Sequence, residues 1–343
     1  MFDCGVIEGF YGRPWSWQQR HAMLDFLAAN GFSQYCYAPK ADACLRKHWQ
    51  QDWPAGVKKQ LLQLAEHARR QGLAFGIGLS PLSLLQDWPA QKPALLQKLA
   101  SLASLQPELL LLLFDDTRGD MPQLAERQCD IAAVVAAALP ATRLMLCPTY
   151  YSFDPLLPEL FGAMPAHYWE DLGRLLDPAI NVLWTGRQVI SEQHDAADLE
   201  DISRRLQRAP VVWDNSRVSD GRNTSPFLPL QAMFTLADLQ PHCRGLLVNP
   251  MNPPALARIV LKTLMLPGSD EQRLADALQQ EAGDLADVIQ QSLPLLRDKG
   301  LDALDDEQRQ CLQACFAGSS HPAAQDICRW LAGEFRFDPA CLT

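Results

Sequence analysis

Eight short apolar runs, each followed by a longer stretch, constrain the fold of this chain more than any other feature. Most of the longer stretches have helical periodicity, and this alternation is typical of βα units whose strands are buried on both faces of a parallel sheet. The predicted strands are Cys4–Glu8, Gln34–Ala38, Ala74–Leu79, Leu109–Phe114, Arg143–Cys147, Asn181–Trp184, Val211–Trp213 and Gly245–Val248. Eight units without a glycine-rich phosphate-binding fingerprint favour a closed (β/α)₈ barrel over an open dinucleotide-binding sheet.

Helices are expected between these strands, and several begin just after a proline, which is favoured in the first helical turn. The expected helices are Ser16–Ala29, Val57–Gln71, Ala94–Leu105, Gln123–Leu139, Ala196–Arg208 and Ala255–Leu266. The helices after the fifth and seventh strands are weakly marked. Closure of the barrel at those two places is therefore inferred from the number of strands.

The alternation ends at the turn Pro267-Gly268-Ser269, after which only helical periodicity remains. The helices expected beyond this turn are Glu271–Arg297, Asp306–Phe316 and Ala323–Phe335. We therefore predict a barrel domain over residues 1–266 and a C-terminal α-helical region over residues 267–343.

The composition limits the partners and the location of the chain. A formal net charge of −10 disfavours nucleic acid and anionic membranes, because no basic stripe is present to displace their counterions. The longest apolar run, Leu109–Phe114, is too short to cross a bilayer, and the start of the chain lacks a basic and apolar leader. We expect a cytoplasmic protein whose ten cysteines are reduced thiols. Cys311, Cys315 and Cys328 do not complete a metal-ligand pattern, so neither a metal nor another cofactor is expected.

Barrel enzymes carry their reacting groups at the C-terminal ends of the strands, so the residues that follow each run are candidates for a site. Charged, amide or aromatic residues follow every run except the third, which is followed by Ser80-Pro81. Aromatic faces beside amides, carboxylates and hydroxyls suit a neutral, hydroxyl-rich ligand such as a sugar. The alternative is that these residues serve turns, as polar residues do at the loops of any barrel.

The pair Asp115-Asp116 directly follows the most apolar run. Adjacent strand side chains diverge, so the two carboxylates can address different atoms of one substrate. Their mutual repulsion raises the pKa of one of them, which allows an acid and a carboxylate to coexist near neutral pH. Two alternatives stay open, namely that one aspartate caps a turn and that the pair binds a divalent cation.

At these residues the chain resembles the family 84 glycoside hydrolases, the group of O-GlcNAcases and bacterial β-N-acetylglucosaminidases. The resemblance covers residues 3–266 and lies in seven motifs that occur in order at strand ends. The motifs are Gly5-Val6-Ile7-Glu8-Gly9-Phe10-Tyr11-Gly12-Arg13-Pro14-Trp15, Tyr37-Ala38-Pro39-Lys40, Phe114-Asp115-Asp116, Pro148-Thr149-Tyr150-Tyr151, Trp184-Thr185-Gly186, Trp213-Asp214-Asn215 and Asn249-Pro250-Met251-Asn252.

The resemblance implies a retaining β-N-acetylglucosaminidase in which the 2-acetamido oxygen of the substrate attacks the anomeric carbon, forming an oxazoline intermediate. It implies that Asp115 orients the acetamido group, that Asp116 is the general acid and base, and that Tyr151 bonds near the acetamido carbonyl. The remaining implied substrate contacts are Gly9 through its carbonyl, Lys40, Thr185, Trp213, Asn215, Asp220 and Asn249. The implied partner is a glycan or glycoprotein that bears N-acetylglucosamine. The apolar stripes in Leu274–Leu296 permit a homodimer through the C-terminal helices or packing of these helices onto the barrel.

Three other functions are weighed against this one. An endo-acting glycosidase of hyaluronan-type polymers would need a long basic groove, which the acidic balance does not favour. A catalytically silent N-acetylglucosamine-binding module would have no use for the Asp115-Asp116 pair. A metal-dependent hydrolase rests on the carboxylate pair alone, because none of the seven histidines is paired at ligand spacing.

Overall fold

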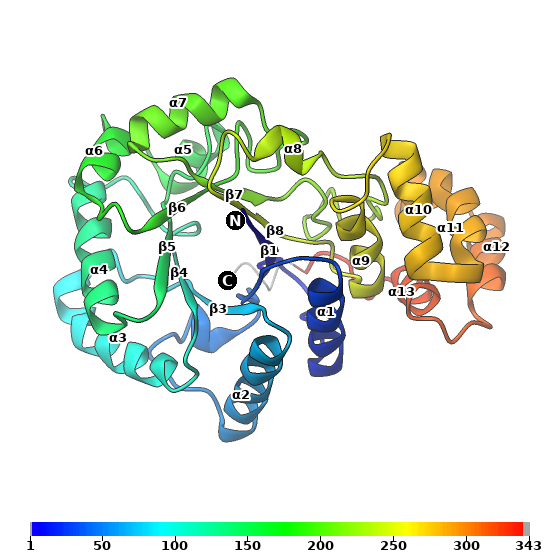
Figure 1. Ribbon diagram of the computed structural model, residues 1–343, viewed down its shortest axis with the longest axis horizontal. Coiled ribbons are helices and arrows are strands. Elements are labelled where there is room, and N and C mark those ends of the chain that lie inside the picture. Colours follow the sequence, from blue (N-terminus) through cyan, green and yellow to red (C-terminus); the bar gives the residue numbers. More distant parts are fainter. Residues whose placement is uncertain (1, 339–343) are drawn as a thin grey trace.

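The computed structural model describes residues 2–338 and contains a closed barrel of eight parallel strands, as predicted (Figure 1). Each strand pairs with the next along the chain, and the first pairs with the eighth to close the barrel. The strands are β1 (Asp3–Glu8), β2 (Gln34–Tyr37), β3 (Ala74–Leu79), β4 (Leu109–Leu113), β5 (Arg143–Cys147), β6 (Asn181–Trp184), β7 (Val211–Asp214) and β8 (Gly245–Val248). Their bounds lie within one residue of the predicted ones.

The barrel wall separates two apolar layers. The inner layer fills the barrel with alternate side chains such as Ile7, Leu111 and Leu247. The outer layer lies between the strands and the surrounding helices and includes Leu110 and Leu112. Both layers are fully buried, which explains why the strands are apolar without interruption rather than alternating.

Helices follow the strands and surround the barrel (Figure 1). After the first four strands they are α1 (Trp17–Ala29), α2 (Ala55–Arg70), α3 (Trp88–Ala103) and α4 (Leu124–Ala138), and after β6 and β8 they are α7 (Ala196–Leu206) and α9 (Pro254–Thr263). Helix α1 begins at a capping box in which Ser16 and Gln19 satisfy each other's backbone N–H groups. Helix α3 begins six residues before the expected Ala94, because Pro89 initiates the first turn and Pro93 is accommodated inside the helix.

The two weakly marked units differ from the regular pattern. Two short helices, α5 (Leu156–Phe161) and α6 (Tyr168–Leu175), connect β5 to β6. Between β7 and β8 the helix is reduced to a single turn, α8 (Leu236–Leu239), which follows a long irregular segment over residues 215–235. That segment lies at the C-terminal end of the barrel and supplies residues to the site described below.

The C-terminal region is helical, as expected, but its first helix is interrupted. The elements are α10 (Asp270–Ala282), η2 (Gly283–Leu285), α11 (Ala286–Leu293), a π-helical turn η3 (Pro294–Lys299), η4 (Leu301–Ala303), α12 (Asp306–Phe316) and α13 (Pro322–Leu331). The prediction of a single helix over Glu271–Arg297 was wrong. Gly283 ends α10 with a φ of 54°, a conformation that glycine adopts readily, and Pro294 ends α11.

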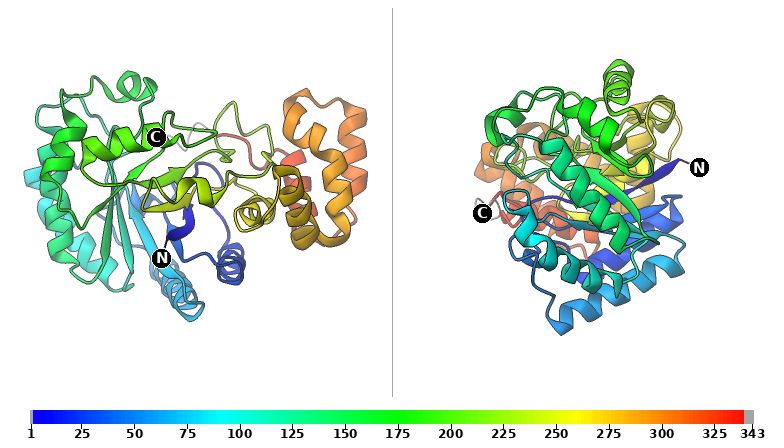
Figure 2. Two further views of the ribbon diagram at one scale, coloured as in Figure 1. Left: turned by 45° about the horizontal axis from the view of Figure 1, so that its top comes forward. Right: turned by 90° about the vertical axis from the view of Figure 1, so that its left-hand side faces the viewer.

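These helices form a lobe on one side of the barrel, beyond α9 (Figures 1 and 2). Helices α10 and α13 pack against α9, and the backbone of Leu296 accepts a hydrogen bond from the Leu228 N–H in the segment after β7. Packing onto the barrel is thus observed, whereas the division of the chain at residue 266 stays a prediction. Among residues 2–338 no helix is long and apolar enough to cross a membrane.

Candidate active site

A pocket of about 540 Å³ opens at the C-terminal ends of the strands. All ten residues that the sequence singled out line it, although they come from seven of the eight units. These residues are Gly9, Lys40, Asp115, Asp116, Tyr151, Thr185, Trp213, Asn215, Asp220 and Asn249. Five further residues complete the lining, namely Tyr11, Cys147, Val189, Ile190 and Val218.

The carboxylate pair lies beside a buried lysine. Lys40 Nζ is 2.5 Å from Asp115 Oδ2 and 3.0 Å from Asp116 Oδ2. The second oxygen of Asp115, Oδ1, is buried and has no hydrogen-bond partner among the described residues. A carboxylate oxygen left in this state is ready to accept a hydrogen bond from a ligand, because a buried acceptor without a donor costs about 1–3 kcal/mol.

Two further side chains bind Asp116. The Tyr11 hydroxyl donates to Asp116 Oδ2 at 2.7 Å, and the Arg46 guanidinium pairs with the same oxygen at 3.1 Å. Lys40 Nζ and Arg46 Cζ each lie 5.5 Å from the centre of the Tyr11 ring. Neither Tyr11 nor Arg46 was assigned a role from the sequence, although Tyr11 stands inside the motif after β1.

The pKa values of the two aspartates are shifted in opposite directions. Burial raises the pKa of Asp115 above its ordinary value, and Lys40 offsets this effect only in part. Burial also raises the pKa of Asp116, but Lys40 and Arg46 together outweigh it, so the pKa of Asp116 is held below its ordinary value. The pKa of Lys40 is raised because its two carboxylate partners outweigh its burial. These opposite shifts favour a proton on Asp115 over one on Asp116.

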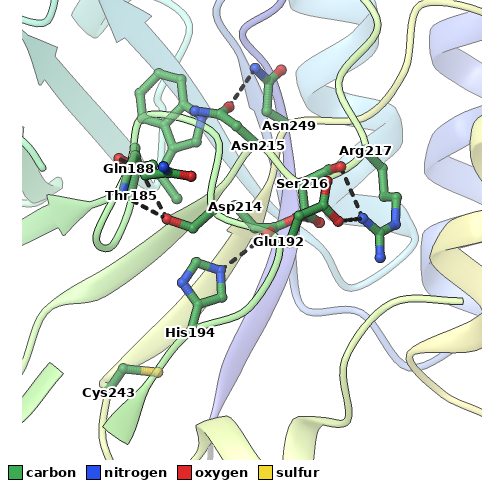
Figure 3. A network of polar contacts seen from close by, with 12 residues as sticks. Thr185, Gln188, Glu192, His194, Asp214, Asn215, Ser216, Arg217, Cys243 and Asn249 are labelled. Atoms are coloured by element: carbon green, nitrogen blue, oxygen red, sulfur yellow. Dashed lines mark hydrogen bonds and ion pairs between the residues drawn. The ribbon is translucent and has the colours of Figure 1, made fainter. Parts of the chain in front are cut away.

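The opposite wall contains a chain of amides (Figure 3). The Oδ1 atom of Asn215 accepts hydrogen bonds from Trp213 Nε1 and Asn249 Nδ2, both at 3.0 Å. The Gly9 N–H donates to Asn249 Oδ1 at 3.2 Å, which links the ends of β1, β8 and β7. Gly9 has to be glycine, because a Cβ atom there would lie 2.8 Å from the Trp213 ring.

A buried histidine–aspartate pair supports this wall from behind (Figure 3). Asp214 is fully buried; its Oδ1 lies 3.0 Å from His194 Nε2, and its Oδ2 accepts from Ser216 Oγ. The Asn215 amide donates to the backbone oxygen of Val189 in the β6–α7 loop. These contacts join the β6–α7 loop to the end of β7, so the two loops form one connected wall.

The other predicted residues lie around the same pocket. The pKa of Tyr151 is raised by burial and by Asp115, so its hydroxyl stays protonated and can donate. Asp220 accepts a hydrogen bond from the Tyr11 N–H at 2.8 Å, and burial raises its pKa. The Thr185 hydroxyl donates to the Gln188 carbonyl, which shapes the loop after β6.

Some polar residues at strand ends do not reach the pocket. Asp42 caps the turn η1 (Ala43–Leu45) and accepts hydrogen bonds from Tyr37 and Trp53. Arg187 is exposed and pairs with Asp198 on α7. For Asp42 the turn interpretation holds. Among residues 2–338 no group of three or more histidine, cysteine, aspartate or glutamate side chains is placed to hold a metal ion.

The fold and the site together define a barrel enzyme with a carboxylate pair at the C-terminal ends of its strands. A family model described as beta-N-acetylglucosaminidase matches residues 4–282. The chain belongs to this family, which confirms the resemblance seen in the sequence.

Individual relatives support the same assignment. The proteins named Protein O-GlcNAcase of Rattus norvegicus and of Mus musculus are each 33% identical over 261 residues, which cover 73% of this chain. The chain spans only 28% of the length of these curated relatives. The solved structure of an aspartate-to-asparagine mutant of the Thermobaculum terrenum O-GlcNAc hydrolase aligns with a TM-score of 0.78 at 24% identity, covering 96% of this chain and 80% of that one. This likeness shows the barrel fold.

Proposed function

We propose that the chain is a retaining β-N-acetylglucosaminidase that removes terminal β-linked N-acetylglucosamine from a glycan or glycoprotein. The observation that supports this proposal most directly is the buried Oδ1 of Asp115, which lacks a donor while Oδ2 is held by Lys40. Asp115 lines the pocket, so a ligand bound there can reach this side chain. An acetamido N–H is a donor of the kind that this oxygen requires.

In the first step the acetamido oxygen forms a bond to the anomeric carbon while the bond to the leaving oxygen breaks. Asp116 gives its proton to the leaving oxygen, and Asp115 accepts a hydrogen bond from the acetamido N–H and stabilises the positive charge that develops. The Tyr151 hydroxyl donates a hydrogen bond near the acetamido carbonyl. In the second step Asp116 takes a proton from water as the water oxygen bonds to the anomeric carbon, and the acetamido oxygen departs.

The order of the two pKa values, with Asp115 above Asp116, is the reverse of what the first step needs. A substrate N–H that bonds to Asp115 favours its charged form, and the resulting charge raises the pKa of Asp116 in turn. Substrate binding would therefore lower the pKa of Asp115 and raise that of Asp116.

The pocket wall opposite the carboxylates supplies the other contacts. The Asn215 and Asn249 amides, the Asp220 carboxylate and the Gly9 carbonyl would bond sugar hydroxyls, and Thr185 and Trp213 would shape the space for the acetamido methyl group. The exposed Ile190 at the rim would lie toward the group attached to the sugar. A cytoplasmic location and a homodimer through the C-terminal helices stay predictions, and sedimentation analysis at several protein concentrations tests the dimer.

Initial rates on four substrates test the proposed function. An aryl N-acetylglucosaminide should be turned over readily, whereas an aryl glucoside, which lacks only the acetamido group, should be cleaved several orders of magnitude more slowly. An aryl N-acetylgalactosaminide tests selectivity at one hydroxyl, and hyaluronan tests endo action. Equal rates on the glucoside and the N-acetylglucosaminide would refute the proposal, and preferential cleavage of hyaluronan would replace it by the endo-acting alternative.

A further inference from the structure

Arg46 occupies an unusual place for an arginine, because it is buried and pairs with the proposed acid, Asp116. Only 4% of the residue is exposed. It directly follows η1, whose position is fixed at both ends. The Asp42 carboxylate accepts from the Cys44 N–H at 3.0 Å, and the Leu45 carbonyl accepts from the Ser80 N–H at 2.8 Å.

The donors around Asp116 converge on one of its two oxygens. Tyr11 at 2.7 Å, Lys40 at 3.0 Å and Arg46 at 3.1 Å all contact Oδ2. A carboxylate with one oxygen held in this way exchanges a proton most readily at its other oxygen. The two cations also act differently, since Lys40 lies closer to Asp115 than to Asp116 whereas Arg46 pairs with Asp116.

We propose that Arg46 is a positioning residue of this site: with Tyr11 it anchors Oδ2 of Asp116, which leaves Oδ1 to give the proton to the leaving oxygen and to take one from water. Its charge stabilises the anionic form that serves as the base in the second step. The same charge opposes protonation and so slows the first step when the leaving group is poor. Arg46 thus sets the balance between the two steps. This inference rests on the proposed function.

Other titratable groups face Asp116 and contribute to the same balance. They are Tyr11, Lys40 and Arg46 from the segments after β1 and β2, Asp115 beside it, Cys147 and Tyr151 from the end of β5, and Asp220 from the segment after β7. Burial raises the pKa of Asp116, and Lys40 and Arg46 overcome this effect. A nearby opposite charge lowers a carboxyl pKa by about 1–3 units. Removing Arg46 alone should therefore have a measurable effect.

The test compares Arg46→Met with Arg46→Lys, which keeps the charge, and with Arg118→Met. Arg118 is a matched control because it lies two residues after Asp116, but 70% of its side chain is exposed and it pairs with Asp120. Two substrates separate the steps. An alkyl N-acetylglucosaminide, with a poor leaving group, reports on the acid step, and the N-acetylglucosamine-derived oxazoline reports on the base step.

For Arg46→Met we expect the basic limb of the kcat/KM profile on the alkyl glycoside to move up by about one pH unit or more. Because the base step needs ionised Asp116, the acidic limb of oxazoline hydrolysis should move up by about the same amount. Arg46→Lys and Arg118→Met should both keep the basic limb of the wild type. If Arg46→Met does not fold, Arg46→Gln provides an uncharged donor for the same measurement.

An unmoved basic limb, with equal losses on the two substrates, would overturn the inference and leave Arg46 a purely structural residue. In that case wild-type turnover of both substrates would still support the proposed function. If the wild type hydrolyses neither substrate, the proposed function and the inference fail together. The two failures are therefore distinguishable.

Discussion

Asp326 joins the C-terminal helices to the barrel and gives a quantitative test of that contact. It lies on α13, is 2% exposed, and accepts a hydrogen bond at 2.7 Å from the Ala255 N–H in the first turn of α9. Helix α9 has no side-chain cap of its own, because Pro253 stands at its N-cap position. Burial raises the pKa of Asp326 to about 6, even though the backbone donors of α9 lower it.

The sign of the effect on stability follows from this pKa. The folded-state value lies above the ordinary value of 3.8, so the contribution of this group to stability is fully present below about pH 3.8 and is lost as the pH rises through about 6. The total loss is about 3 kcal/mol. Asp326→Asn keeps an oxygen acceptor for Ala255 but cannot ionise. Its advantage over the wild type should therefore grow by about 2 kcal/mol between pH 4.5 and pH 7.5.

Urea unfolding followed by tryptophan fluorescence at several pH values measures this difference, because Trp330 is buried on the same helix. Asp326→Leu is the control that removes the acceptor, and it should lose about 1–3 kcal/mol relative to Asp326→Asn at every pH. A difference between the wild type and Asp326→Asn that does not change with pH would refute the reasoning. A wild type that is more stable than Asp326→Asn at pH 7.5 would refute it as well.

The other predictions concern the pocket. Asp116→Asn should slow substrates with poor leaving groups far more than activated aryl substrates, whereas Asp115→Asn should slow both kinds alike. Plots of rate against leaving-group pKa for the wild type and both variants check this, and exchanged patterns would mean that the two roles are exchanged. Asn215→Ala and Asn249→Ala should each weaken N-acetylglucosamine binding by about 1–3 kcal/mol, measured by calorimetry, and unaltered affinity would place the sugar elsewhere. EDTA should leave turnover unchanged, and a loss that a divalent ion restores would favour a metallohydrolase.

The barrel could be predicted because its strands are buried on both faces. Leu109–Leu113 is the clearest case, since five leucines in a row leave no exposed side for a strand. The irregular segments of the chain could not be predicted from the periodicity of its apolar residues. Between β7 and β8 the chain forms only the single helical turn α8. Gly283 interrupts a helical segment whose apolar pattern continues on both sides of it.

The site residues could be predicted where they directly follow a strand. Parallel strands in a barrel end at the same rim, so Asp115, Asn215 and Asn249 meet although they are far apart in the chain. Cys147 was interpreted as an apolar strand residue, and it is one, but it also forms part of the pocket floor. Val189 lies within a loop, where no rule from the sequence says which side chain turns inward.

Arg46 shows most clearly what sequence patterns leave out. It stands six residues after Lys40, beyond the strand end, and nothing local distinguishes it from the other members of a set of 30 lysines and arginines. Its approach to Asp116 depends on η1, which is held in part by the backbone of Ser80 at the end of β3. That strand end carries no reacting group, so its contribution is visible only in three dimensions. A carboxylate in a strand-end motif predicts chemistry from its position alone, but the charge that tunes it is placed by tertiary contacts.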